Sequence, residues 1–237
     1  MSRKFDVNTE AVANGRPEQV WAAVVAGGSG WQWPAEVEPR LGGAGPFGSE
    51  VTAWQPPNHF GIEMTGPDGF FNILDYVFEE LPGESTRVRY RHSGIFLTEM
   101  SDDEWANQYD GVRLHTAFYL HTLGQYVQYF AGRQAAFADV QGPEASGSAQ
   151  AFEVLKQAIG AEQQGQQISF EVPGIGTIAG ELDYLTEHFA GVRTANAMYR
   201  FFGRNAFGQV VGMTIHEFGE AAEAHDAQWQ EWLAGLY

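Results

Sequence analysis

The chain has 237 residues, of which 44% are hydrophobic, 14% aromatic and 18% charged, so it can form a sizeable core and is not typical of a disordered protein. It carries 30 Asp and Glu against 13 Lys and Arg, and the resulting charge of −17 disfavours nucleic acids and anionic membranes as partners because they are also negative. The absence of cysteine excludes disulfides, thiolate metal sites and cysteine nucleophiles.

The chain is expected to begin with a strand and a helix. Residues 3–12 alternate between apolar and polar side chains, which is typical of a half-buried strand. Pro17 suits the first turn of a helix that continues through Trp21. The Gly- and Pro-rich stretch 42–48 lacks the Gly-Lys-Ser/Thr of a phosphate-binding loop, so we interpret it as a flexible connection.

Three strands are predicted next. Residues 59–64 alternate, and residues 70–81 are apolar on both faces for much of their length. The clearest alternation runs over 86–94 and places His92 on the inner face. The same alternation puts three arginines outside, where we expect Glu79, Glu80 or neighbouring acids to pair with them: Arg87, Arg89 and Arg91.

A long helix is predicted over residues 102–137. Ser101 and Glu104 have the spacing of a capping box, with Ser at the N-cap and Glu three residues later. Aromatic and aliphatic residues then recur every three or four positions from Trp105 to Phe130. A second partial row, with Leu114 and Phe118, predicts that the helix packs on two sides.

The rest of the chain is expected to form a linker and a smaller α+β unit. Residues 139–149 are rich in Gly, Ser and Pro, as linkers are. The elements predicted after them are a helix at 150–159, strands at 166–172, 176–185, 188–202 and 207–218, and a helix at 220–236. The segment from Phe201 to Gly208 is interpreted as a hairpin, with Gly203 and Asn205 suited to positive φ.

The order and spacing of several segments resemble the SRPBCC (START-like) superfamily, in particular its branch similar to the C-terminal domain of the Hsp90-ATPase activator. The segments are PEQVW (17–21), the tryptophans before the Gly-rich stretch, the Pro-Pro-x-x-Phe element (56–60), the strand 86–96 and the helix 103–133. The resemblance covers about residues 1–138. It implies an α+β helix-grip fold, in which a curved antiparallel sheet surrounds a long helix, plus a smaller α+β unit over 150–237.

Such a fold implies a pocket for a hydrophobic small molecule between the sheet and the long helix. Aromatic walls with a few polar groups suit such ligands. The candidate lining residues are Trp31, Trp33, Trp54, Phe71, Tyr90, His92, Trp105, Tyr109 and Tyr119. For each aromatic residue, ordinary core packing is the alternative to a role in binding.

Three functions stay open: a non-catalytic carrier or sensor of a hydrophobic small molecule, a cyclase- or dehydratase-type enzyme that uses His92 and a tyrosine, and an interaction protein resembling the chaperone-ATPase activator. We find no catalytic motif and expect no cofactor and no metal, since His115 and His121 are six residues apart and His216-Glu217 lacks the second histidine of a zinc-protease motif. No apolar run suits a signal peptide or membrane span, so we expect a cytoplasmic protein, with a protein partner or homodimer left open.

Overall fold

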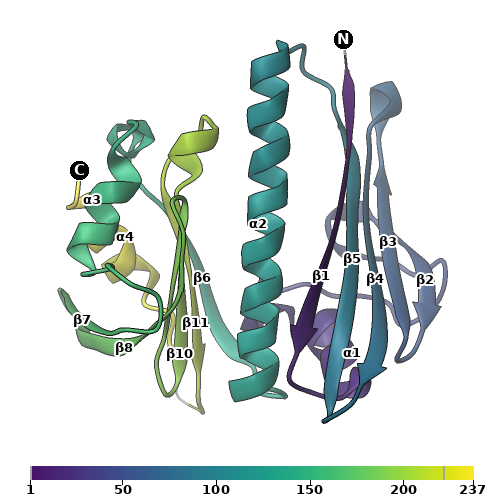
Figure 1. Ribbon diagram of the computed structural model, residues 1–237, viewed down its shortest axis with the longest axis horizontal. Coiled ribbons are helices and arrows are strands. Elements are labelled where there is room, and N and C mark those ends of the chain that lie inside the picture. Colours follow the sequence, from purple (N-terminus) through teal and green to yellow (C-terminus); the bar gives the residue numbers. More distant parts are fainter. Residues whose placement is uncertain (1, 221) are drawn as a thin grey trace. The chain divides into compact units, whose positions relative to one another are not determined.

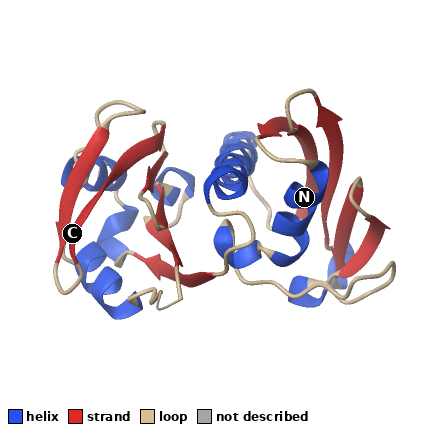
Figure 2. Cartoon of the chain, turned by 90° about the horizontal axis from the view of Figure 1, so that it is seen from below, coloured by secondary structure: helices blue, strands red, loops and turns tan. Residues whose placement is uncertain are grey.

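The computed structural model describes residues 2–220 and 222–237. The chain divides into two compact units, Met1–Arg133 and Gln134–Tyr237, here called the N-terminal and C-terminal units. Within the described residues there are two antiparallel sheets and four α-helices (Figure 1, Figure 2). The predicted α+β class is therefore confirmed, and the arrangement is consistent with a helix-grip-like fold.

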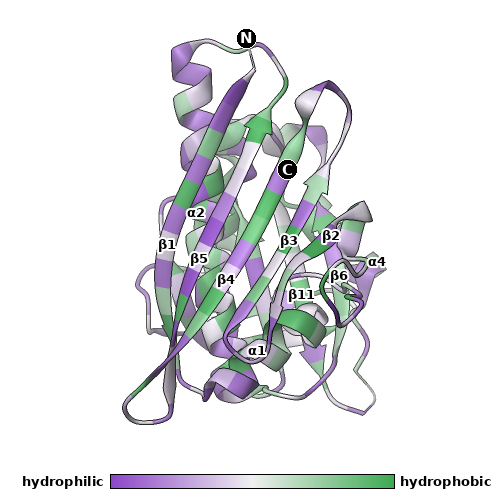
Figure 3. Cartoon of the chain, turned by 90° about the vertical axis from the view of Figure 1, so that its right-hand side faces the viewer, coloured by the Kyte–Doolittle hydropathy of each residue, from purple (hydrophilic) through white to green (hydrophobic). Residues whose placement is uncertain are grey.

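The N-terminal unit contains an antiparallel sheet in the order β1-β5-β4-β3-β2. Its elements are β1 (Arg3–Ala13), α1 (Pro17–Ala26), β2 (Glu50–Gln55), β3 (His59–Thr65), β4 (Phe71–Leu81), β5 (Ser85–Phe96) and α2 (Asp102–Tyr129). Bands of hydrophilic and hydrophobic residues alternate along β1 and β5, whereas β4 is hydrophobic over much of its length (Figure 3). These patterns match the predictions made for residues 3–12, 70–81 and 86–94.

The outer face of this sheet carries an ionic network. Arg89 lies 2.7 Å from Glu79 and 3.1 Å from Glu10, and Arg91 lies 2.8 Å from Asp6. Arg87 contacts the same two glutamates, Glu79 at 3.3 Å and Glu10 at 3.7 Å. The predicted pairing of the three arginines with nearby acids is confirmed. The opposite, inner face is buried and includes Phe5, Val7, Tyr76, Phe78, Val88 and Tyr90.

Helix α2 is continuous over 28 residues and packs against β1 and α1. The predicted capping box is present: the Glu104 amide donates to Ser101 Oγ, and Ser101 N donates to the Glu104 carboxylate. The helix ends at Tyr129, before the predicted end at 137, because Phe130 leaves the helical conformation and Gly132 has a positive φ of 77°.

The C-terminal unit has an antiparallel sheet in the order β6-β11-β10-β9-β8-β7. Its elements are β6 (Ala135–Gln141), α3 (Ala151–Ala158), β7 (Gln167–Val172), β8 (Gly176–Leu185), β9 (Phe189–Arg193), β10 (Ala197–Phe202), β11 (Gly212–Phe218) and α4 (Asp226–Ala234). Residues expected to begin a linker at 139 thus lie within β6, which pairs with β11. Of the helix expected over 220–236, residue 221 lies outside the described residues.

Two predictions for this unit are wrong in detail. The strand expected over 188–202 is interrupted at residues 194–196, where Thr194 N donates to the Ala197 carbonyl and closes a turn between β9 and β10. The expected hairpin is present as the antiparallel pair of β10 and β11, but its connection is longer than predicted and contains a 3-10 turn at residues 204–207. The positive φ of 79° belongs to Gly208, whereas Gly203 has φ −79°.

The core of the C-terminal unit is a cluster of buried aromatic and aliphatic side chains. Trp229 of α4 is fully buried and contacts Tyr199 and Trp232, with ring centroids 5.0 and 5.6 Å apart. The sheet also carries a buried ion pair, in which Arg200 Nη1 lies 2.6 Å from Asp183 Oδ1 and the side chains are 1% and 2% exposed. Gly191 adjoins the pair, since a Cβ there would lie 2.1 Å from Arg200 Nη1.

The two units have a similar order of elements, although, within the described residues, four strands follow the first α-helix in the N-terminal unit and five follow it in the C-terminal unit. Each begins with a strand and an α-helix, continues through an antiparallel meander and ends with an α-helix. In each, the first strand lies at the sheet edge and pairs with the last strand of the meander, β1 with β5 and β6 with β11. The two units thus share this part of their topology, with β6 as the element that the sequence pattern did not indicate.

Candidate ligand site

Two tyrosines lie opposite each other on the inner face of the N-terminal sheet. Tyr76 of β4 pairs with Tyr90 of β5, and their ring centroids are 4.6 Å apart. Burial raises the pKa of Tyr76, an effect partly opposed by its hydrogen bond with Tyr90. Burial likewise raises the pKa of Tyr90, as do neighbouring Tyr76 and Tyr119. Both side chains are therefore neutral phenols at physiological pH.

His92 lies two residues further along β5, partly buried on the same face. Its Nε2 is 3.2 Å from Asn72 Nδ2, and its ring meets Phe5 edge-on with centroids 5.0 Å apart. Burial lowers the pKa of His92 to about 4, so the imidazole is neutral at pH 7. A neutral imidazole can accept a hydrogen bond at one nitrogen and donate one from the other.

A small cavity lies beside Tyr76, lined also by Trp31 and Trp33. Trp31 is buried and donates its indole N–H to the Ala23 carbonyl at 2.9 Å, while Trp33 meets Tyr119 edge-on at 5.8 Å. The cavity measures about 40 Å³, with Phe60, Ile62 and Leu74 among its apolar walls. This volume has room for a water molecule but not for a metabolite.

Four other candidate residues lie elsewhere in the unit. Trp54 packs edge-on against Trp21 with centroids 5.0 Å apart. Phe71 alternates away from the inner face of β4, and the Lys4 ammonium lies 5.5 Å above its ring. Trp105 and Tyr109 stack at 5.3 Å on the first turns of α2.

Of the nine candidate residues, Trp31 and Trp33 line the cavity beside Tyr76. The structure brings Tyr90 near His92, with centroids 6.3 Å apart, and joins Trp33 to Tyr119. Trp105 and Tyr109 instead hold the start of α2 on β1, through the Arg3 guanidinium 5.9 Å from the Trp105 ring and the Tyr109 hydroxyl donating to the Asp6 carbonyl at 3.3 Å.

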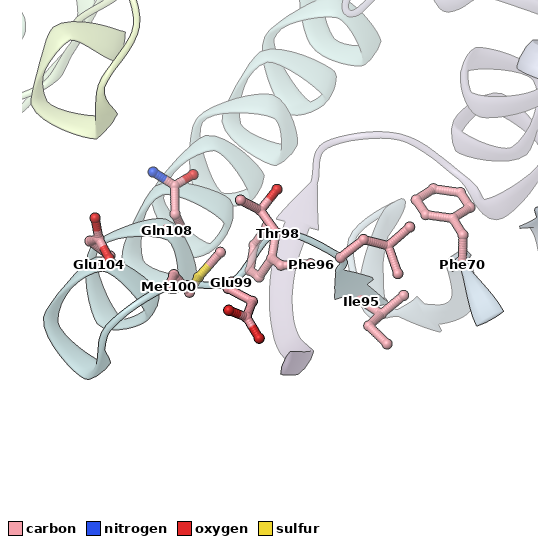
Figure 4. Close-up of a pocket in the computed structure, with 9 residues that line it drawn as sticks. Phe70, Ile95, Phe96, Thr98, Glu99, Met100, Glu104 and Gln108 are labelled. Atoms are coloured by element: carbon pink, nitrogen blue, oxygen red, sulfur yellow. The ribbon is translucent and has the colours of Figure 1, made fainter. Parts of the chain in front are cut away.

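A larger opening lies where β5 leaves the sheet and the chain enters α2. This opening, called here the β5–α2 groove, has a volume of about 470 Å³. Its side chains extend from Gln108 and Glu104 on α2 to Phe70 before β4 (Figure 4). The lining residues are Phe70, Ile95, Phe96, Leu97, Thr98, Glu99, Met100, Glu104 and Gln108.

Sequence reasoning missed the groove, although one signal was available. The clear alternation of β5 stops after Gly94, and three apolar residues follow in succession: Ile95, Phe96 and Leu97. Consecutive apolar residues in a strand point alternately to its two faces, so they cannot all face one core. Leu97 is indeed 41% exposed.

Carboxylates are the charged groups that line the groove. Glu104 Oε2 accepts a hydrogen bond from Ser101 N at 2.7 Å, and its bonds with Ser101 lower the pKa of Glu104. Glu99 contributes the second carboxylate, and the described lining residues include no Lys, Arg or His. Arg3, on β1, is paired with Asp102. The groove thus combines apolar walls with negative charge.

The histidines predicted not to bind metal are dispersed. His115 Nδ1 contacts the Gly111 carbonyl at 2.7 Å, and His216 Nε2 contacts Thr214 Oγ1 at 3.0 Å. Glu217 accepts from the Tyr199 hydroxyl at 3.2 Å. In the described parts of the chain, no three His, Asp or Glu side chains cluster as metal ligands would.

The described parts of the chain also contain no helix long and apolar enough to cross a membrane.

Comparisons with known proteins give distant structural similarities. No known family model matches the chain, and no curated protein matches its sequence. Protein MLL2253 from Mesorhizobium loti is 18% identical, with 53% of this chain and 98% of that chain covered and a TM-score of 0.42. CalU16 from Micromonospora echinospora is 13% identical, covering 54% and 86%, with a TM-score of 0.40. DynU16, from the dynemicin biosynthetic locus, is 13% identical over 98% and 97%, with a TM-score of 0.41.

Proposed function

We propose that the N-terminal unit binds a hydrophobic small molecule in the β5–α2 groove. The observation that carries this proposal is an opening of about 470 Å³ with apolar walls, within the size range of small-molecule sites. The cavity beside Tyr76, at about 40 Å³, is too small for such a ligand. The groove thus differs in position from the pocket expected between sheet and helix.

We also infer that this unit belongs to the SRPBCC (START-like) superfamily. The inference is supported by the order strand, helix, antiparallel meander and long helix, with β1 paired to β5. It is further supported by the sequence resemblance over residues 17–21, 56–60, 86–96 and 103–133. An apolar binding site is the property that the superfamily and the groove have in common.

The groove favours binding over acid–base catalysis. His92, the histidine considered for catalysis, is not among its described lining residues, and neither is a tyrosine. The ring of Phe5 lies 5.0 Å from the His92 ring and 4.9 Å from that of Phe96, a residue of the groove. Phe5 therefore lies between the groove and the imidazole.

Binding of the neutral dye Nile red tests the proposal. The full chain should bind the dye with saturable fluorescence, and Leu97→Asn should weaken binding about five- to tenfold, since an apolar side chain of the groove is lost. Leu41→Asn is the matched control, because Leu41 is also exposed, at 66%, but lies outside the groove. Equal affinities of the two variants would reject the groove as the site.

A further inference from the structure

The apolar part of the groove adjoins a negatively charged end. Glu99 lies in the connection after β5, and Glu104 lies on the first turn of α2. Figure 4 shows both side chains on the side of the groove formed by this connection and helix, with Gln108 one turn further and Phe70 at the far end. A ligand lying along the groove would have its apolar part toward Phe70 and its polar end near these groups.

The ligand charge favoured at this end is opposite to the charge favoured at a bare helix N-terminus. Free backbone N–H groups there would favour an anion. In α2, however, Ser101 caps the helix and the first turn carries Asp102, Asp103 and Glu104. These groups already complement the helix dipole, so an additional anion would meet three carboxylates.

Glu104 keeps acceptor capacity after capping the helix. A carboxylate has about four acceptor positions, and its bonds with Ser101 use only part of them. A primary ammonium has three donors and no acceptor, which complements a carboxylate. The charge of the whole chain, −17, also raises the local concentration of cations.

We propose that the β5–α2 groove selects a cationic amphiphile, an alkyl amine in preference to an alcohol or a carboxylate of the same chain length. This inference rests on the proposed function, since it concerns the ligand of the same groove. The alkyl chain packs on Phe96, Leu97 and Met100, and the ammonium lies beside Glu99 and Glu104.

Displacement of Nile red from the full chain by decylamine, decanol and decanoate tests this selectivity. At low salt, decylamine should bind about five- to tenfold more tightly than decanol, with decanoate weakest, and 0.5 M NaCl should reduce the difference. Glu104→Gln should weaken decylamine binding about threefold and leave decanol unchanged. Glutamine at this position still supports a capping box, so the helix start is retained.

Glu80→Gln is the charge-matched control. Glu80 is exposed at the opposite end of the β4–β5 hairpin, where β4 pairs with Thr86. Equal losses in both variants would show a general charge effect and overturn the inference. If decanol displaces the dye as well as decylamine does, the selectivity is rejected while the binding function stands. If none of the three compounds displaces it, both proposals fail.

Discussion

Asn72 and His92 face each other across β4 and β5, with the amide Nδ2 of Asn72 3.2 Å from the imidazole Nε2 of His92. An amide nitrogen can only donate, so Nε2 accepts and the proton of the neutral imidazole lies on Nδ1. Protonation of His92 would remove that acceptor and place a charge against the Phe5 ring. In this orientation of the Asn72 amide, the hydrogen bond therefore requires an uncharged His92.

The stability of the protein should consequently fall as the pH is lowered from about 6.5 to about 4. Over this range the unfolded chain, with the ordinary histidine pKa of 6.5, takes up a proton that the folded His92 does not. The loss is up to about 3 kcal/mol. Urea unfolding of wild type and His92→Gln should show a difference in unfolding free energy that shrinks from pH 7 to pH 4.5; a pH-independent difference would contradict the prediction.

Gly94→Ala should destabilise the N-terminal unit by about 1–3 kcal/mol, the usual range for overpacking. A Cβ at Gly94 would lie 2.6 Å from Cζ of Phe5, and the ring is held between His92 and Phe96. Thermal unfolding measures the loss. Phe5→Leu in the same background should recover part of it; a Gly94→Ala protein as stable as wild type would show that the ring moves freely.

Gly124→Ala should have the opposite effect. Gly124 lies inside α2, and the nearest atom to a Cβ there, apart from chain neighbours and the helix backbone, is the Val12 carbonyl oxygen at 3.9 Å. Alanine therefore fits, and it should raise the unfolding free energy by about 0.5–1 kcal/mol through reduced backbone freedom in the unfolded chain. A lower melting temperature would show that the helix requires glycine at this position.

Asp183→Asn should destabilise the C-terminal unit by about 3–5 kcal/mol, because it removes the carboxylate that compensates the buried Arg200 charge. Asp110→Asn is the matched control, since it breaks an ion pair with Arg113 whose side chains are about half exposed. That change should cost less than about 1 kcal/mol. Denaturant unfolding measures both losses. Similar losses in unfolding free energy for the two variants would contradict the assignment of Asp183 as an essential partner of Arg200.

Elements with strong local signals were predictable from sequence. The Ser101–Glu104 capping box located the start of α2, and the alternation around Tyr90 located β5 with its faces. Strand β6 was missed because Ala135, Ala136 and Ala138 are compatible with a helix. They become a strand through pairing with β11, about 80 residues later in the chain, and local patterns do not report such pairing.

The candidate site was predictable in composition more than in position. Alternation placed Tyr90 and His92 on the inner face, but packing decides whether space beside that face stays open, and the cavity beside Tyr76 measures only about 40 Å³. Phe71 was assigned to the pocket although its position in β4 has the opposite parity from Tyr76. The groove depends on how the chain turns between Phe96 and Ser101, a geometry that no periodic pattern encodes.

The pairing of first with last strands also determines how each unit can fold during synthesis. Residue Val7 meets its neighbour His92 only after the whole meander has been made, and Ala138 must wait for Ile215. Until then β1 and β6 lack the strand that holds them at the sheet. Pairing between strands that are distant in sequence slows folding. Mutations in β5 or β11 should therefore reduce the yield of folded protein during synthesis more than equally destabilising changes in the β3–β4 or β8–β9 hairpins.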